Sequence, residues 1–391
     1  MEAPRLPAVK RLAAACLYDD DVTGSSSGQA RTATADQVTI QDVARAAGVG
    51  RQTVSNVLND SGRVGEAARA RVLEAVAALG YHPHHGARSL RSRRTGQLAY
   101  VLPPALLLPS NYIMQLFLQA LAAASGRRSY NMLVVVPEGD PRAEMRRLIA
   151  SRSVDAFLLS DLRRDDPRVT LLAEAGMPFA CFGRTGPGLP QHWVDFDNRA
   201  AIITAVHHVL DRGFSRLAFL GYQSGDRWDD ERAAGFTAGL AGRGVPAGEA
   251  EMVLVDEASA RERIRSLLDG TRPAARPEAI VTGSDRLAAM IYGVAAELGL
   301  RIGRDLAVTG FDGSIPTDLL HPTLTSISIP VDDIARRVVL RALQQVSGTS
   351  DGSPGEVVET SLRLGESTVG THAARTPLPA RHLDHNAGTS A

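Results

Sequence analysis

The apolar residues between positions 38 and 80 recur at helical spacing and predict three short helices. The first is marked by Ile40, Val43, Ala44 and Ala47, and the third by Val72, Ala75, Val76 and Leu79. Thr39 and Asp42 are spaced to cap the start of the first helix, and Gly48 permits a sharp turn, after which Val49 fills the angle between two helices. Gly80 ends the third helix. Three helices of this size predict one small core.

The middle helix, which begins at Arg51, divides into an apolar and a polar side. Val54, Val57 and Leu58 are predicted to face the core. The other side carries groups that suit base edges and phosphates: Arg51, Gln52, Thr53, Ser55, Asn56 and Asn59. Gln and Asn pair with adenine, Arg with guanine, and Thr or Ser with phosphate or a thymine methyl group. The pattern predicts a helix-turn-helix that reads DNA, and the alternative is a plain three-helix packing unit.

From Gln97 the pattern changes to short apolar runs that alternate with amphipathic stretches. The runs predict buried parallel strands at 98–102, 132–136, 156–159, 179–182, 217–221, 252–255, 279–282 and 306–311. Helices are predicted at 114–124, 142–150, 199–210, 230–240, 261–268, 287–298 and 331–346. Strand and helix alternate twice over, which predicts an α/β fold with two doubly wound parallel-sheet lobes. The cleft between the lobes, at the carboxyl ends of strands, is the expected ligand site.

Charge is balanced over the whole chain but concentrated locally. The 391 residues include 43 basic and 43 acidic side chains, so the bulk protein does not indicate a polyanionic partner. Between Thr39 and Arg94, however, nine arginines outnumber four acidic residues. This surplus of positive charge predicts an electrostatic footprint for DNA at one end of the molecule and binding that weakens strongly with salt.

Several classes of site and location are excluded by what the sequence lacks. Cys16 and Cys181 form no CxxC or Cys/His ligand spacing, and the histidines at 82, 84 and 85 have no acidic or thiol partner, so no metal or cofactor is expected. No phosphate-binding glycine loop and no catalytic triad or carboxylate pair can be located, which argues against an enzyme. With no signal peptide and no run of about 18 apolar residues, we expect a cytoplasmic protein without membrane spans.

Three segments together resemble the lactose/galactose repressor (LacI/GalR) family: TIQDVARAAGV, QTVSNVLN and GYHPHHGARSLRSRRTG. The resemblance extends from Val38 to about Gly370. It implies a hinge that becomes helical on operator DNA and inserts one leucine per subunit into the minor groove, and the match places that leucine at Leu90. Arg88 and Arg91 would then contact phosphates that offset the cost of bending the duplex. The alternative for Leu90 is an ordinary apolar linker residue.

The chain departs from the family pattern at a few positions in the helical region. Gly50 replaces the usual serine, and Gly65 and Ala68 replace the usual capping serine or threonine and a threonine, which predicts a less firmly started third helix. Asn56 stands where arginine is common, which exchanges a charged donor for an amide that prefers adenine. We therefore expect an altered operator preference.

The resemblance further implies a core like that of periplasmic sugar-binding proteins, with the chain crossing between lobes near Asp197, Ser326 and Ser350. The helix at 331–346 would return to the first lobe and contribute to a dimer interface. The expected domains are a disordered extension at 1–37, the helix-turn-helix domain at 38–86, the hinge helix at 87–96, the ligand-binding and dimerisation domain at 97–370 and a disordered tail at 371–391. Within the large domain, the first lobe would comprise about 97–196 and 327–350, and the second 197–326 and 351–370.

Six polar or aromatic residues follow the predicted strands and are expected to face the cleft: Arg184, Trp228, Arg232, Ser284, Asp285 and Asp312. The resemblance implies that Arg232 and Asp312 hold sugar hydroxyls, and Ser284 and Asp285 match the usual polar pair. Carboxylate and guanidinium groups beside an aromatic ring suit a polyol. For three of these residues the alternatives are that Asp285 starts a helix, Arg232 forms a surface ion pair and Trp228 is an exposed loop aromatic.

The sequence therefore predicts a homodimeric, sequence-specific DNA-binding transcriptional regulator, a repressor whose affinity for a near-palindromic operator is controlled by a small metabolite, a sugar above all. Two alternatives share the same α/β lobes: a secreted solute-binding protein and a sugar-modifying or nucleotide-modifying enzyme. Purine-like ligands and corepressor action also remain open.

Overall fold

The computed structural model describes residues 38–58, 64–81, 94–102, 112–246, 248, 250–269, 276–314 and 319–369. The chain forms two compact units, Met1–Pro83 and His84–Ala391. In the part of the chain that is described, no helix is long and apolar enough to cross a membrane.

The first unit is a three-helix fold made of α1 (Ile40–Ala47), α2 (Arg51–Leu58) and α3 (Glu66–Leu79). Its core brings together Val43, Val54 and Val72, one from each helix. Gly48 and Gly80 end α1 and α3 in the left-handed conformation, with φ of 62° and 59°. Leu79, predicted on the apolar stripe of the third helix, is instead 36% exposed at the end of α3, and Tyr81, which follows the helix, is buried in the core.

The caps of these helices differ as the sequence indicates. Asp42 accepts hydrogen bonds from the backbone N–H of Thr39 at 2.9 Å and from its hydroxyl at 2.6 Å, which fixes the start of α1. Gly65, at the N-cap of α3, offers no side-chain acceptor. The third helix is tied instead through Arg71, whose Nε donates to the carbonyl of Ala47 at 3.2 Å and so satisfies the carboxyl end of α1.

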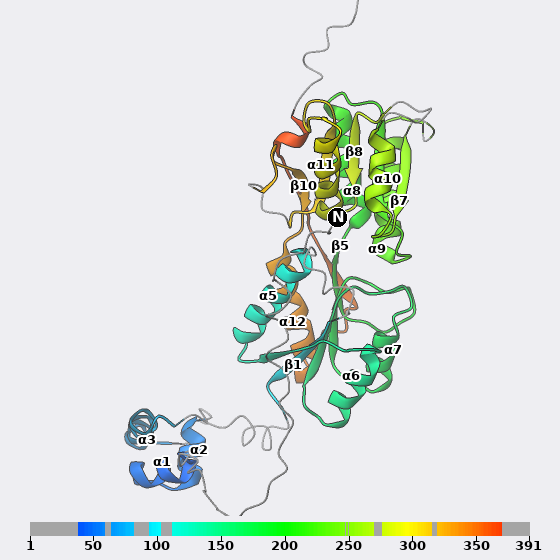
Figure 1. Cartoon of the computed structure of the whole chain (residues 1–391). Helices are drawn as coiled ribbons and strands as arrows, with labels where there is room; N and C mark the ends of the chain where they lie inside the picture. The colour runs from blue at the N-terminus through cyan, green and yellow to red at the C-terminus, as the bar shows by residue number, and fades with distance from the viewer. Residues whose placement is uncertain are drawn as a thin grey trace, which may run out of the picture. The chain divides into compact units, whose positions relative to one another are not determined.

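The second unit contains two six-stranded sheets (Figure 1). The first sheet is entirely parallel and has the order β11-β5-β4-β3-β1-β2. Its strands are β1 (Gln97–Val101), β2 (Asn131–Val135), β3 (Ala156–Leu159), β4 (Phe179–Phe182), β5 (Trp193–Phe196) and β11 (Gly355–Val358). Helices α5 (Tyr112–Gly126) and α12 (Val331–Ser347) cover one face, and α6 (Pro141–Ala150) and α7 (Pro167–Glu174) cover the other. We call this assembly the first lobe.

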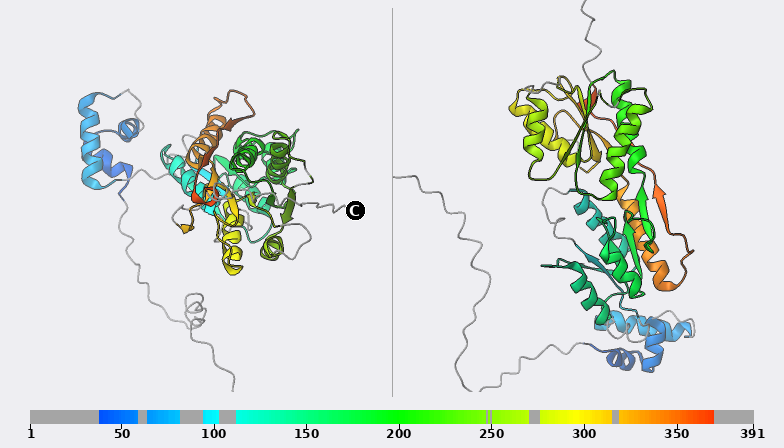
Figure 2. Two further views of the ribbon diagram at one scale, coloured as in Figure 1. Left: turned by 90° about the horizontal axis from the view of Figure 1, so that it is seen from above. Right: turned by 90° about the vertical axis from the view of Figure 1, so that its right-hand side faces the viewer.

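The second sheet has the order β12-β10-β9-β8-β6-β7, parallel except for β12. Its strands are β6 (Leu217–Tyr222), β7 (Glu251–Val255), β8 (Ala279–Thr282), β9 (Ala307–Asp312), β10 (Thr325–Ser328) and β12 (Ser361–Arg363). Helices α8 (Asn198–Asp211) and α9 (Arg227–Ala241) pack on one face, and α10 (Ala260–Leu268) and α11 (Asp285–Glu297) on the other (Figure 2). A short 3-10 helix, η4 (Glu366–Thr368), follows β12. This assembly is the second lobe.

Alternating side chains on each strand explain why both sheets are covered on two faces. In β6, Phe219 packs toward α8 and α9 whereas its neighbour Leu220 packs toward α10 and α11. The fold predicted from the sequence, two doubly wound parallel lobes after a helix-turn-helix head, is confirmed. The expectation that the run 132–136 is a buried strand is corrected: Val134 and Val136 are 38% and 49% exposed, because β2 forms the edge of its sheet.

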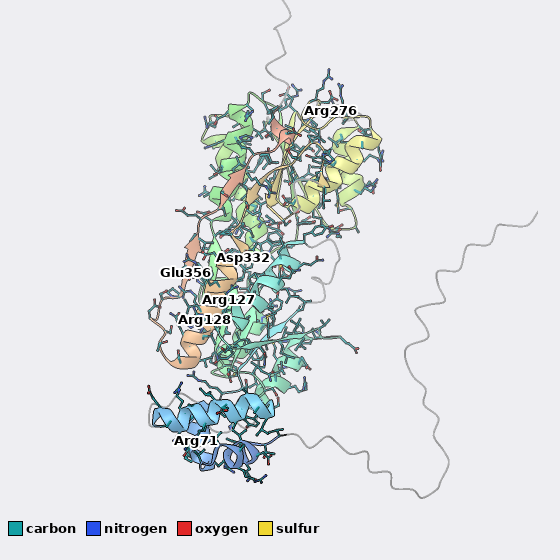
Figure 3. All side chains as sticks on the ribbon, turned by 90° about the vertical axis from the view of Figure 1, so that its left-hand side faces the viewer. Arg71, Arg127, Arg128, Arg276, Asp332 and Glu356 are labelled. Atoms are coloured by element: carbon teal, nitrogen blue, oxygen red, sulfur yellow. The ribbon has the colours of Figure 1, made fainter. Side chains whose placement is uncertain are left out.

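The chain passes between the two sheets after β5, after β10 and between β11 and β12. The third passage therefore lies between Val358 and Ser361 and not near Ser350, because β11 still pairs with β5 in the first sheet. Glu356 of β11, which Figure 3 labels, also pairs with Arg337 and Arg341 of α12. The distances are 2.5 and 3.2 Å, and the two pairs fix this late strand in the first lobe.

Candidate functional site

Fewer residues of α2 are accessible on its polar side than the sequence predicts. Arg51 and Gln52 are exposed, Thr53 and Asn56 are half-buried, and Gln52 Nε2 donates to Asn56 Oδ1 at 3.0 Å. Ser55 is only 9% exposed, so its expected place on the outer side is corrected. At about 100° per residue Ser55 lies beside Leu58 on the helical wheel, at the margin of the core-facing side.

Thr39 is exposed at the start of α1, but its hydroxyl already donates to Asp42. The hydrogen bonds from Thr39 hold the pKa of Asp42 below its usual value, so this carboxylate is firmly ionised. Four further residues expected at the DNA interface, Asn59, Arg88, Leu90 and Arg91, lie outside the described residues.

The second unit contains a cavity of about 460 Å³ lined by residues of both lobes. This volume is in the range of small-molecule sites, roughly 300–1,000 Å³. The cavity lies at the carboxyl ends of strands: β4 leads into Arg184, β6 ends at Tyr222 and β9 ends at Asp312. Five of the six residues expected in the cleft line it, namely Arg184, Trp228, Arg232, Ser284 and Asp312.

Arg232 of α9 is the most constrained of these residues. Its guanidinium lies 3.8 Å from the ring centre of Phe311 and 4.7 Å from that of Trp228. Its Nε donates to Asn198 Oδ1 at 2.8 Å and its Nη1 to the carbonyl of Gly283 at 2.6 Å. With 6% of its surface exposed, Arg232 is not the surface ion pair that the sequence left as an alternative.

Asp312 faces Arg232, with 3.7 Å between its Oδ1 and Nη2 of the arginine. Its backbone has a positive φ of 102°, a strained conformation that turns the chain at the end of β9. Burial raises the pKa of Asp312 to about 8 in spite of the nearby arginine. Burial likewise raises the pKa of Asp229, one helical turn from Arg232, to about 7. The site thus combines a fixed cation with carboxyl groups that titrate near neutrality.

Arg184 extends the site toward the first lobe. Its Nε donates to Asp195 of β5 at 2.6 Å, and its Nη2 lies 3.5 Å from Glu231 of α9, so it joins the two lobes. Its guanidinium lies 5.0 Å from the ring centre of Trp193. Cation–π contact on one side and two carboxylates on the other hold the arginine at the cavity wall.

Ser284 and Asp285 have different places. Ser284 lines the cavity, and its Oγ accepts a hydrogen bond from the N–H of Leu287 as the N-cap of α11. Asp285 does not line the cavity, which corrects the expectation of a direct ligand contact. It is fully buried and accepts hydrogen bonds from Ser326 Oγ at 2.5 Å and from the N–H of Ser314 at 2.6 Å. Its geometry suits a positioning residue that fixes Ser314, which does line the cavity.

Sequence reasoning missed most of the acidic lining. Asp161 lies two residues after the end of β3 and Asp195 lies in β5, and both line the cavity together with Asp226 and Glu231 of the second lobe. The rule that selected Arg184, a polar residue just after a strand, also fits Asp161. Asp195 was hidden because the strand that carries it was not predicted. Among the described residues, no cluster of histidine, cysteine and carboxylate groups could hold a metal ion.

Comparison with known proteins gives matches to both units. Residues 39–84 match the model for bacterial regulatory proteins of the lacI family, and residues 206–368 match the periplasmic binding protein-like domain. The transcriptional regulator CelR of Thermobifida fusca is 30% identical over 336 residues, which cover 84% of this chain and 98% of CelR. The chain belongs to the LacI family of transcriptional regulators. GalR of Salmonella typhimurium is 26% identical and is covered over 98% of its length, against 88% of this chain.

Solved structures agree with this assignment. A CelR–cellobiose complex is 27% identical, with a TM-score of 0.62 over 84% of this chain and 99% of that one. The lac repressor dimer bound to operator and an anti-inducer is 23% identical, with a TM-score of 0.71. The match covers 85% of this chain and 99% of that one, and it shows that the two proteins have the same fold. As a member of this family the chain is a DNA-binding regulator; the two alternatives, a solute-binding protein and an enzyme, are not supported.

Proposed function

We propose that this LacI-family protein is a cytoplasmic repressor that binds a near-palindromic operator as a homodimer and releases it when a sugar occupies the cavity between its lobes. The observation that carries the proposal is the cavity itself, in which Arg232, Asp312 and Trp228 surround the space that both lobes line. The similar CelR structure holds cellobiose, which supports a saccharide as ligand.

The ligand contacts follow from the chemistry of the lining. Arg232 and Asp312 offer a fixed donor and an acceptor to adjacent hydroxyls, and Trp228 offers a flat apolar face to a sugar ring. Arg184 and Ser284 would contact the ligand from opposite lobes. Because groups from both lobes take part, ligand binding stabilises a particular angle between the lobes.

The DNA contacts are assigned from α2 and from the family resemblance. Arg51, Gln52 and Asn56 would read base edges, and Thr53 would contact a phosphate. Thr39, whose hydroxyl donates to Asp42 in this structure, would have to exchange that hydrogen bond for one to a phosphate. Asn59, Arg88, Leu90 and Arg91 complete the interface through the family pattern, with Leu90 as the minor-groove wedge. The proposed domains are a helix-turn-helix at 38–86, a hinge at 87–96 and an effector and dimerisation domain from 97 to 370.

The test is selection of duplex DNA by the purified protein from a random pool, with and without each member of a sugar panel that includes cellobiose. We expect enrichment of a symmetric sequence and its loss with one of the sugars. A matched pair of variants separates the two functions: Gln52→Ala should change the selected sequence, and Arg232→Met should keep the sequence but abolish its response to sugar. Equal recovery of symmetric and scrambled duplexes under every condition would refute the proposal.

Binding at the two sites must be reciprocal if the repressor is allosteric. Whatever factor the sugar imposes on operator affinity, the operator must impose on sugar affinity. Calorimetric titration of the sugar with and without saturating operator measures that factor directly, and an unchanged sugar affinity would contradict the coupling.

A further inference from the structure

The positive charges of the cavity are already neutralised by the protein. Among the described residues, four arginines line the cavity, and each pairs with a carboxylate that also lines it. The pairs are Arg184 with Asp195 and Glu231, Arg227 with Glu231, Arg232 with Asp312, and Arg286 with Glu257. At neutral pH Arg184, Arg227 and Arg286 therefore provide no free cation for an anionic ligand, and Arg232 is neutralised by Asp312 once that carboxyl group ionises, at about pH 8 and above.

Three carboxylates of the lining remain after these pairs are formed: Asp161, Asp226 and Asp256. Asp256 accepts a hydrogen bond from the N–H of Ser259 at 2.7 Å, as an ordinary turn residue. Asp161 and Asp226 belong to opposite lobes and, within the part of the chain that the structure describes, neither forms an ion pair. The nearby Arg168 is bound to Asp166 at 2.7 Å, and Arg163 is exposed and does not line the cavity.

The local environment already disfavours negative charge at these positions. Burial raises the pKa of Asp161, and repulsion from Asp226 raises it further, against the attraction of Arg168 and Arg163. Burial also raises the pKa of Asp226 and of Asp195. A site that resists the ionisation of its own carboxyl groups imposes the same penalty on a phosphate or carboxylate brought in by a ligand.

We infer that the effector carries no negative charge, and that Asp161 and Asp226 select against phosphorylated and carboxylated sugars. The inference rests on the proposed function, since it concerns the ligand of the same cavity. To reach Arg184, Arg227 or Arg232, an anion would have to displace Asp195, Glu231 or Asp312 and leave that carboxyl group largely buried and without its partner, which costs more than the new contact returns. A neutral polyol needs no such exchange because its hydroxyls can donate to the acidic groups.

The chain provides its own reporter for the test. Its two tryptophans are Trp193 and Trp228, each stacked with an arginine of the cavity wall. Tryptophan fluorescence of the full-length protein therefore follows occupancy of this site. The probes are two matched sets. The first is glucose, 6-amino-6-deoxyglucose, glucuronate and glucose 6-phosphate, which differ only at the exocyclic carbon C6, and the second is cellobiose with cellobiose 6′-phosphate.

We expect the neutral member of at least one set to bind and its anionic counterparts to bind at least tenfold more weakly. If glucose binds, the amino sugar should bind no more weakly, because its group at C6 is close in size to the carboxylate of glucuronate but carries the opposite charge. Tighter binding of the phosphate or carboxylate form would overturn the inference while leaving the regulator intact. Equal losses for the amino sugar and glucuronate would also overturn it, since any change at C6, and not negative charge, would then weaken binding. If no saccharide binds although operator binding is intact, the sugar ligand of the proposed function fails, and the inference falls with it.

Variants locate the selection. Asp161→Asn and Asp226→Asn should each reduce the ratio of the affinity for the neutral sugar to that for the anionic sugar by about fivefold to tenfold. The affinity for the neutral sugar should change less than the affinity for the anionic one. Asp165→Asn is the matched control, because Asp165 lies in the same loop, is exposed and does not line the cavity. A neutral-to-anionic ratio that stays constant in both variants, or falls equally in the control, would show that these two carboxylates do not set the selectivity.

Discussion

The contact between α8 and α9 depends on Gly235, and the same substitution elsewhere should have the opposite effect on stability. A Cβ atom at Gly235 would lie 2.6 Å from the carbonyl oxygen of Arg199 and 3.0 Å from Cβ of Ile202. The first of these is backbone and cannot rotate away, so Gly235→Ala must separate the two helices. At Gly293 of α11, which is exposed, the nearest atom to an added Cβ is Nη1 of Arg261 at 3.9 Å.

The magnitudes follow from two competing terms. Replacing glycine by alanine inside a helix gains about 0.8–1.0 kcal/mol from backbone propensity. Forcing one extra carbon into a close-packed interface costs about 1–3 kcal/mol. Because the closest contact at Gly235 is with backbone, the upper part of that cost, about 2–3 kcal/mol, applies there. Gly235→Ala should therefore lower the free energy of unfolding by about 1–2 kcal/mol, whereas Gly293→Ala should raise it by up to about 1 kcal/mol.

The first variant should also weaken the effector site. Arg232 lies one turn before Gly235 on α9, and its hydrogen bond to Asn198, the residue before Arg199, crosses the same helix contact at 2.8 Å. Separation of the helices stretches that bond, and hydrogen bonds to charged groups contribute about 1.5–3 kcal/mol. We expect about a tenfold loss of sugar affinity in Gly235→Ala and none in Gly293→Ala.

Urea unfolding followed by tryptophan fluorescence measures the stability change, with equal m values required for the comparison. Titration with the effector measures the second effect. The reasoning is refuted if Gly235→Ala is as stable as the wild type, or if the two alanine variants change stability in the same direction.

Three further predictions concern single side chains. Because burial raises the pKa of Asp312 to about 8, the folded protein binds one more proton than the unfolded chain between about pH 4 and 8. The free energy of unfolding should therefore fall as the pH rises through this window, while the affinity for a ligand that donates a hydroxyl proton should rise. Asp312→Asn should remove both the pH dependence of stability and that of affinity. Arg164 pairs with Asp230 across the lobes at 2.6 Å, but both are exposed, so Arg164→Ala should alter unfolding free energy by less than about 1 kcal/mol and sugar affinity only at low salt. Asp42→Ala should accelerate amide hydrogen exchange in α1 several-fold, whereas Glu74→Ala, an exposed change in α3, should not.

The sequence predicted the elements that are long or uniformly apolar. The run at 279–282 matches β8, and the helix expected at 331–346 matches α12 to within one residue. The elements it missed are short and carry mixed patterns: β5 contains Asp195, and β10 reads Thr-Ser-Ile-Ser. Such strands are fixed by pairing with neighbours distant in sequence, which local periodicity does not encode.

The candidate site was predicted as single residues but not as a charge arrangement. Position after a strand identified Arg184 and Asp312, because parallel sheets gather those ends at one edge, whereas Arg232, inside α9, was identified through the family resemblance. Two other predicted residues, Asp285 and Ser55, proved to be buried. Asp285 follows the same rule but turns inward to Ser326, and Ser55 turns toward the core at the margin of α2. Side-chain direction within a turn or at a helix margin depends on tertiary packing, which the pattern of residue types leaves open.

Aromatic packing connects the cavity to the first lobe. Arg232 contacts the ring of Phe311, whose centre lies 5.9 Å from that of Phe196; Phe196 is 6.1 Å from Phe182, and Phe182 is 4.9 Å from Phe117 of α5. Close-packed rings have little free volume, so a shift of Phe311 has to be accommodated by its neighbours. Among these ring contacts, the one between Phe311 of β9 and Phe196 of β5 joins the two sheets. Because Arg232, Phe311 and Phe196 form a packed path from the cavity to the first lobe, we expect a ligand that moves Arg232 to change the angle between the lobes.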